Sequence, residues 1–97
     1  MRLKKEYIEI IKSAVKYYFG ESTQVFLFGS RTDDNKKGGD IDLYIETDIK
    51  DHVFEKKIKL LRKLHKELGE QKIDIVINNF TGDKYIYRAA KEEGIPL

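Results

Sequence analysis

Two short segments, residues 40–46 and 72–77, alternate between apolar and polar side chains. Strict alternation predicts strands with one buried face, because successive side chains of a strand point to opposite sides of a sheet. In the segment DIDLYIE, Asp40 and Asp42 share the polar face, and in KIDIVI Asp74 lies opposite three isoleucines. Two such strands require a small sheet whose apolar face is covered by other elements.

Helical periodicity accounts for much of the remaining chain. Apolar residues at steps of three and four predict helices over residues 3–19 and 49–68, the second with Asp48 as its N-cap. Gly20 and Gly69 are the expected helix stops. The first apolar stripe consists of Leu3, Tyr7, Ile8, Ile11, Val15, Tyr18 and Phe19, and the second consists of Phe54, Ile58, Leu61, Leu64, His65 and Leu68.

Two further elements complete the order. The apolar run QVFLF, residues 24–28, predicts a buried strand, and residues 82–93 are predicted to form an amphipathic helix that ends at Gly94, before Pro96. The order helix, strand, strand, helix, strand, helix predicts an α/β fold of the α+β two-layer type, with one small mixed sheet of about three strands covered by helices. With 97 residues, the chain is expected to form a single domain over residues 1–97.

Composition narrows the class of protein. Charged residues make up 37% of the chain but the formal net charge is only +2, so the charges are mixed. This argues against nucleic acid as the main partner, which needs a concentrated basic face. The lysines of the second predicted helix are interpreted either as a solvated face or as a patch that steers phosphate. The chain has no cysteine and no apolar run typical of a membrane span or a signal peptide, so a cytoplasmic location is expected.

The acidic side chains on the polar faces of the two predicted strands cost electrostatic free energy, because their negative charges lie close together. Residues i and i+2 of a strand lie about 6.5 Å apart on one face, and two carboxylates at that distance repel by about 2 to 3 kcal/mol at an effective dielectric constant of about 20. If the two strands are neighbours, Asp40, Asp42 and Asp74 converge, and such a cluster is tolerable when a cation neutralises it or a proton is shared. Oxygen ligands without histidine or cysteine favour Mg²⁺ or Mn²⁺ over zinc. The alternative interpretation is a solvent-exposed sheet face that happens to carry acidic residues.

A Gly-Ser pair lies directly after the predicted strand QVFLF. Gly29 permits a tight turn and close approach of the backbone to a ligand, and Ser30 can donate its hydroxyl and its backbone N–H to phosphate. The pair on its own is a common way to end a strand. Its context makes it more specific, because nine residues separate it from Asp-Ile-Asp in the next predicted strand.

This stretch, LFGS-RTDDNKKGG-DIDLYI, resembles the nucleotidyltransferase signature of the DNA polymerase beta superfamily: a hydrophobic strand, Gly-Ser, a short spacer, and Asp-x-Asp between hydrophobic residues. The segment KIDIVI and the ending AAKEEGIPL extend the resemblance over the whole chain. In length the chain is most similar to the minimal nucleotidyltransferases (MNT or MntA-like), which serve as antitoxins beside HEPN-domain toxins. The resemblance implies a polymerase-beta-like nucleotidyltransferase palm.

For the acidic residues, the resemblance implies a site with two Mg²⁺ ions, or Mn²⁺ in their place. Asp40 and Asp42 would bind both ions, and Asp74, the third acid, would hold the catalytic ion and help to deprotonate the attacking hydroxyl. All three are therefore expected to be catalytic residues and metal ligands. In such a reaction a hydroxyl attacks the α-phosphate of a nucleoside triphosphate, and pyrophosphate leaves.

For the Gly-Ser pair, the resemblance implies nucleotide binding. Gly29 and Ser30 would hold the triphosphate, and Arg31 is expected either to touch phosphate or to lie on the surface. The resemblance implies ATP as the substrate. The sequence contains no motif that would recognise an adenine base, so this expectation rests on the resemblance alone.

The resemblance also implies a function, which is transfer of AMP from ATP to a tyrosine of a HEPN toxin or of another helical partner protein. The chain would then be the antitoxin of a toxin–antitoxin pair. Two alternatives stay open: the chain could block its partner by docking without catalysis, or it could be a transferase subunit that acts on RNA or on a small molecule. An oligomer is compatible with each of them. Candidate docking aromatics, which could equally pack in the core, are Tyr17, Tyr18, Phe80, Tyr85 and Tyr87.

Overall fold

A computed structural model of the chain describes residues 3–28, 40–69, 72–80, 87 and 91–97, with the side chain of Asp40 excepted. Its helices and strands are α1 (Lys5–Phe19), β1 (Gln24–Phe28), β2 (Asp40–Glu46), α2 (Val53–Leu68), β3 (Lys72–Asn78) and β4 (Ile95–Pro96). The helix predicted over residues 82–93 falls mostly outside the described residues, but its described members, 87 and 91–93, are helical.

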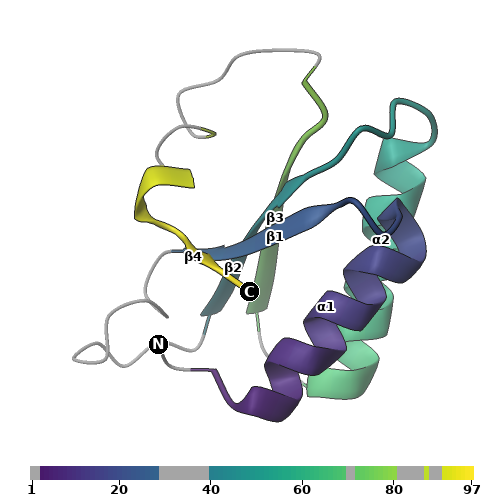
Figure 1. Ribbon diagram of the computed structural model, residues 1–97. Helices are drawn as coiled ribbons and strands as arrows, with labels where there is room; N and C mark the ends of the chain where they lie inside the picture. Colours follow the sequence, from purple (N-terminus) through teal and green to yellow (C-terminus); the bar gives the residue numbers. More distant parts are fainter. Residues whose placement is uncertain (1–2, 29–39, 70–71, 81–86, 88–90) are drawn as a thin grey trace.

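The strands form a mixed sheet in the order β3-β2-β1-β4 (Figure 1). β1 runs antiparallel to β2 and to β4, whereas β2 and β3 run parallel. The predicted α+β fold with a small mixed sheet is confirmed, but the sheet has four strands rather than about three. The fourth strand is only Ile95 and Pro96, opposite Leu27 and Phe26, which is too short for an alternating pattern to reveal.

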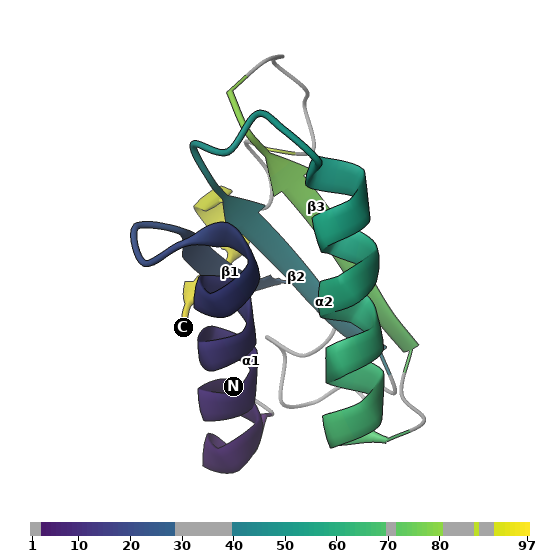
Figure 2. The ribbon, with the colours of Figure 1, turned by 90° about the vertical axis from the view of Figure 1, so that its right-hand side faces the viewer.

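α1 and α2 cover the same face of the sheet (Figure 1). They lie side by side and run in opposite directions (Figure 2). α2 connects β2 to β3, as a crossover between parallel strands requires. The buried core between helices and sheet includes Ile11, Ala14, Val15 and Phe19 of α1, Leu60, Leu64 and Leu68 of α2, and Val25, Leu27, Ile41, Leu43, Ile45, Ile73 and Ile75 of the sheet. Neither described helix has the length and hydrophobicity needed to cross a membrane.

Glycines end both helices, as predicted. Gly20 has a φ of 103° and donates its N–H to the carbonyl oxygen of Lys16 at 2.9 Å. Gly69 has a φ of 85° and donates its N–H to the carbonyl oxygen of His65 at 3.0 Å. Both φ values strain a residue that has a side chain, so glycine is the residue type that fits at these two stops.

The start of α2 differs from the prediction. The helix begins at Val53, later than expected, and its N-cap is His52 rather than Asp48. The backbone of His52 is left-handed, with a φ of 56°. A left-handed residue cannot continue a right-handed helix, so residues 49–51 stay outside α2; there the hydroxyl of Thr47 accepts the N–H of Ile49 at 3.3 Å.

The buried stripe of α2 also differs from the prediction. The sequence predicts Phe54 and His65 on the apolar stripe, but both are exposed, Phe54 by 70%. The helix instead buries Leu60, Leu64 and Leu68, which recur every four residues and so lie above one another. At about 100° per residue, Phe54 lies about 80° around the helix from Leu64, the middle residue of that stripe.

Leu64→Ala is expected to lower the free energy of unfolding by about 2 to 5 kcal/mol, because it leaves a cavity at a fully buried position. Phe54→Ala is the matched control, since it removes a larger side chain from an exposed position and should change that free energy by less than about 0.5 kcal/mol. Urea unfolding followed by circular dichroism measures both values. Equal losses in the two variants would show that Phe54 belongs to the core.

Candidate functional site

The second face of the sheet, the open face, lies opposite the two helices. Strand register arranges its residues in three rows across β1, β2 and β3: Phe28, Asp42 and Asp74; Phe26, Tyr44 and Val76; and Gln24, Glu46 and Asn78. The middle row forms a small apolar cluster with Phe28 and Tyr87. The open face therefore has an apolar centre with one polar row on each side of it.

The first of these rows, the acidic row, joins two predicted site residues that are far apart in the sequence. Asp42 and Asp74 are register partners on β2 and β3, and neighbouring strands lie about 4.8 Å apart. Phe28, the last residue of β1, is the register partner of Asp42 on its other side. Because Gly29 and Ser30 come directly after Phe28 in the sequence, the chain enters the Gly-Ser pair from the acidic row.

A lysine that the predicted site omits lies beside these acids. Lys72 is the register partner of Asp40, and its Nζ lies 3.9 Å from Oδ2 of Asp74. Both side chains of the ion pair are more than half exposed, so the pair stabilises the fold by no more than about 1 kcal/mol. The alternating pattern of the strand could have identified Lys72, because a residue two positions before Asp74 lies on the same face of the strand.

The two carboxylates of the acidic row repel each other. At about 5 Å the repulsion is about 3 kcal/mol for an effective dielectric constant of about 20, and water reduces it at Asp74, whose side chain is 52% exposed. The ammonium group of Lys72 offsets part of what remains. Carboxylate oxygens are also the donors that Mg²⁺ and Mn²⁺ prefer, and those of Asp74 are accessible to water.

The other predicted site residues are only partly described. Asp40 is the first residue of β2, and its side chain lies outside the described residues, as do Gly29, Ser30 and Arg31. Within the part of the chain that the structure describes, no group of three or more acidic or histidine side chains is placed to hold a metal ion. That part lacks the Asp40 side chain, so the site of three acids stays a prediction.

At the opposite end of the open face, three side chains form a buried hydrogen-bond network. The Tyr44 hydroxyl donates to Oε2 of Glu46 at 2.7 Å and accepts from Nδ2 of Asn78 at 3.1 Å. Oδ1 of Asn78 accepts the backbone N–H of Phe80 at 2.9 Å. Oε1 of Glu46 accepts a hydrogen bond from Nζ of Lys91 at 3.3 Å. Lys91 belongs to the C-terminal segment, of which residues 87 and 91–97 are described. The network joins β2, β3 and the C-terminal segment at the end of the face away from the acidic row.

The C-terminal segment lies on the side of the sheet away from α1 and α2 (Figure 1). Its Tyr87 ring packs on Tyr44, with ring centroids 6.2 Å apart, and Tyr44 packs in turn on Phe26, at 5.6 Å. Tyr44 is left only 1% exposed. The polar side of this strand is therefore half-buried at Asp42 and closed at Tyr44.

Burial raises the pKa of the Tyr44 phenol to about 12, from an ordinary value of 10. The hydrogen bond from Asn78 opposes this rise, and the hydrogen bond to Glu46 and its negative charge add to it. The folded protein therefore keeps a proton on Tyr44 in a pH range where the unfolded chain has lost it.

The free energy of unfolding is expected to fall by about 2 kcal/mol as the pH rises from 10 to 12, because the unfolded state binds fewer protons at Tyr44 than the folded state does there. Below pH 10 this contribution is fully present. Tyr44→Phe removes the ionisable group, so its unfolding free energy should depend less steeply on pH in the same range. Urea unfolding at a series of pH values compares the two slopes, and identical slopes would contradict the assignment.

Comparison with known proteins adds one finding. Residues 5–97 match a family model described as a nucleotidyltransferase domain. The match begins at the first residue of α1 and extends past β4, so it includes the acidic row and the Gly-Ser pair. No curated protein matches the chain.

Proposed function

Because the chain belongs to the nucleotidyltransferase domain family, we propose that it transfers a nucleoside monophosphate, AMP from ATP, to a hydroxyl group in a metal-dependent reaction. Family membership supports transfer of nucleotidyl groups; the metal, the nucleotide and the acceptor are the added part of the proposal. The observation that carries it is the register of β2 and β3, which makes Asp42 and Asp74 neighbours on the open face. Asp40, two residues before Asp42 in the same strand, is the proposed third acid.

Asp40, Asp42 and Asp74 are proposed to hold two Mg²⁺ ions, with Mn²⁺ as a substitute. The donor set fits such ions, because it offers carboxylate oxygens, and the side chain of Asp74 is more than half exposed, so water can reach it as a further ligand. Bound ions would neutralise charge on the triphosphate and on the leaving pyrophosphate. Lys72 adds an exposed positive charge beside Asp74 on the same face.

The side chains themselves position the reactants and accept one proton. The hydroxyl oxygen of the acceptor forms a bond to the α-phosphorus, and the bond from that phosphorus to the oxygen bridging the β-phosphate breaks, which releases pyrophosphate. Asp74 is proposed to take the proton that the hydroxyl loses. Its half-exposed side chain on an outer strand of the described sheet supports this role, because an acceptor can reach it from the side.

Gly29, Ser30 and Arg31 are proposed to bind the triphosphate. Glycine lets the backbone approach a phosphate closely, and the serine hydroxyl and N–H are donors of the type that phosphate oxygens accept. Arg31 would add a charged, multidentate donor. Because the chain enters this segment from Phe28, the proposed phosphate ligands begin next to the acidic row in the sequence.

The proposed acceptor is a tyrosine on a HEPN-family toxin or another helical partner protein, which would make the chain a cytoplasmic antitoxin. The resemblance of LFGS-RTDDNKKGG-DIDLYI to the minimal nucleotidyltransferases is the reason to name this class of partner. The exposure of Asp74 supports an acceptor on a macromolecule, because a protein side chain can reach an open face without entering an enclosed pocket.

Asp42→Asn and Asp74→Asn are each expected to lower the rate of AMP transfer by about 10² to 10³-fold, because each removes a charge that organises the transition state. Asp51→Asn is the matched control, since Asp51 is an exposed acid just before α2 and should be dispensable. The assay follows label from ATP marked at its α-phosphate onto purified partner protein in the presence of Mg²⁺. Chelation by EDTA should abolish the transfer in the unsubstituted chain.

The outcomes of this assay, together with a measurement of toxin neutralisation by the same variants, assign the function. Label on the partner protein that requires both acids and Mg²⁺ supports the proposal. Label that goes only to RNA or a small molecule, with the same requirements, keeps the transferase and rejects the protein acceptor. Undiminished neutralisation of the toxin by both Asn variants rejects catalysis and leaves docking as the mechanism.

Lys72→Met is expected to strengthen Mn²⁺ binding by up to about fivefold, because it removes an exposed ammonium group that competes for Asp74. Lys63→Met is the matched control, since Lys63 forms a similar exposed pair with Glu67, at 3.0 Å, on the helices. Electron paramagnetic resonance of free Mn²⁺ without nucleotide measures the dissociation constant independently of activity. Weaker binding by Lys72→Met would contradict competition, and unchanged binding after joint replacement of Asp42 and Asp74 by Asn would place the ion elsewhere.

A further inference from the structure

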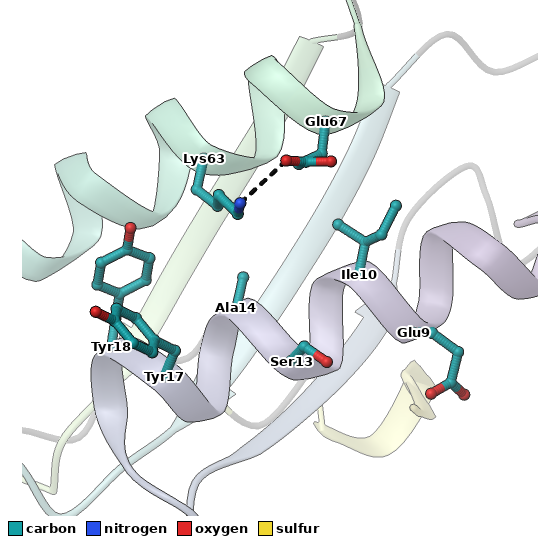
Figure 3. Close-up of a pocket in the computed structure, with 8 residues that line it drawn as sticks. All are labelled: Glu9, Ile10, Ser13, Ala14, Tyr17, Tyr18, Lys63 and Glu67. Atoms are coloured by element: carbon teal, nitrogen blue, oxygen red, sulfur yellow. Dashed lines mark hydrogen bonds and ion pairs between the residues drawn. The ribbon is translucent and has the colours of Figure 1, made fainter.

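A groove of about 610 Å³ runs between α1 and α2, on the helical side of the molecule (Figure 3). On α1 it is lined by Glu9, Ile10, Ser13, Ala14, Tyr17 and Tyr18. Lys63 and Glu67 of α2 form the opposite wall, where they pair with each other at 3.0 Å. Figure 3 shows the two tyrosines at one end of this stretch of α1 and Glu9 at the other.

Tyr17 is the unusual residue of this groove. It is 82% exposed, more than any other large hydrophobic residue that the structure describes. Its ring meets that of Tyr18 edge to face, with centroids 4.9 Å apart. An exposed aromatic side chain at the edge of a groove is typical of a protein–protein interface, because its burial in a complex removes a large apolar area from water.

We propose that α1, which forms one wall of this groove, packs antiparallel on α1 of a second copy of this chain about a two-fold axis at Ser13. In a two-fold contact the same surface serves both partners, so residues on one side of the axis meet residues at the same distance on the other side. Ser13 then faces itself, and Glu9 faces Tyr17 of the other copy. The exposed tyrosine of each copy thereby covers the groove of the other.

The residue types along α1 suit this pairing. Ser13 and Ala14, near the crossing, are small enough to let two helices approach closely. The Tyr17 ring would cover Ile10 of the other copy, which buries apolar area on both residues. The Tyr17 hydroxyl would lie beside the Glu9 carboxylate and could donate a hydrogen bond to it.

Charge also favours a second copy over other occupants. Glu9 and Lys16 lie on opposite sides of Ser13, so antiparallel pairing brings the carboxylate of each copy toward the ammonium group of the other. Of the groove lining, Lys63 and Glu67 neutralise each other, so two like surfaces do not repel strongly. The same lining lacks the concentrated positive charge that nucleic acid requires.

The expected dimer is weak and leaves both candidate sites accessible. A single pair of helices buries less area than a standard interface, which buries about 1,600 Å², so the dissociation constant should be on the order of micromolar. The groove lies on the helical side, whereas the acidic row lies on the open face of the sheet. The two open faces would therefore point away from the contact.

Cysteine substitutions test the axis directly, because the chain has no cysteine of its own. Ser13→Cys is expected to form a disulfide between two copies under mild oxidation, since that bond requires Cα atoms within about 7 Å of each other. Ser22→Cys is the matched control, at an exposed serine beyond α1, and should stay monomeric. Non-reducing electrophoresis of the full chain reads out both. Failure of Ser13→Cys to cross-link, or equal cross-linking of the two variants, would overturn the proposal.

Sedimentation equilibrium over a range of micromolar concentrations tests the same contact without a covalent bond. Tyr17→Glu is expected to raise the dissociation constant of the dimer at least about tenfold, because it puts a second carboxylate opposite Glu9. Phe54→Glu, at another exposed aromatic residue, is the control and should leave the dimer unchanged. An unsubstituted chain that stays monomeric at all concentrations, including one that assembles only with RNA or a different protein, overturns the proposal. So does a dimer that Tyr17→Glu does not weaken.

Discussion

The parallel pairing of β2 with β3 places the core on one face of the sheet and the acidic residues on the other. Its register sets Ile41, Leu43 and Ile45 beside Ile73, Ile75 and Ile77, under the helices. Burial of an aliphatic side chain contributes about 1.5 to 3 kcal/mol, so these side chains together outweigh a repulsion of about 3 kcal/mol between two carboxylates. A slip of one residue would turn the isoleucines outward and Asp74 inward. Apolar burial on the far side of the same strands thus keeps Asp42 and Asp74 together despite their repulsion.

Most of the fold could be predicted because its signals are local. Alternation identifies β2 and β3, and Gly20 and Gly69 mark the ends of the helices from their immediate neighbours. The features that the sequence did not reveal depend on contacts between distant or irregular parts of the chain. The late start of α2 coincides with the left-handed backbone of His52, and the exposure of Phe54 depends on which side of α2 the sheet takes. The two residues of β4 are identified as a strand by their pairing with β1, because two residues are too few to show an alternating sequence pattern.

The candidate site shows the same division. Alternation assigns each aspartate to a face of its strand. Asp42 lies beside Asp74 only if the two strands are neighbours, which the sequence alone does not establish and which the observed pairing of β2 with β3 shows. Lys72 could have been found by the same two-residue step from Asp74. Tyr44 has the same periodicity as the acids, yet it is buried, because Tyr87 arrives from a segment that is remote in the sequence.

The single proline of the chain has a consequence for how the protein behaves at high concentration. Leu97 donates its N–H inward to the carbonyl oxygen of Val25 at 3.0 Å. The nitrogen of Pro96, one residue earlier, therefore lies on the outer border of the sheet as far as the structure describes it, where it has no hydrogen to offer. The opposite border begins with the charged Lys72 and Asp74. Unprotected borders are where sheets recruit foreign strands and grow into fibrils. Pro96 thus interrupts hydrogen bonding at the β4 border, and charged side chains lie at the β3 border. Both features disfavour the addition of further strands and amyloid-like stacking of this small sheet.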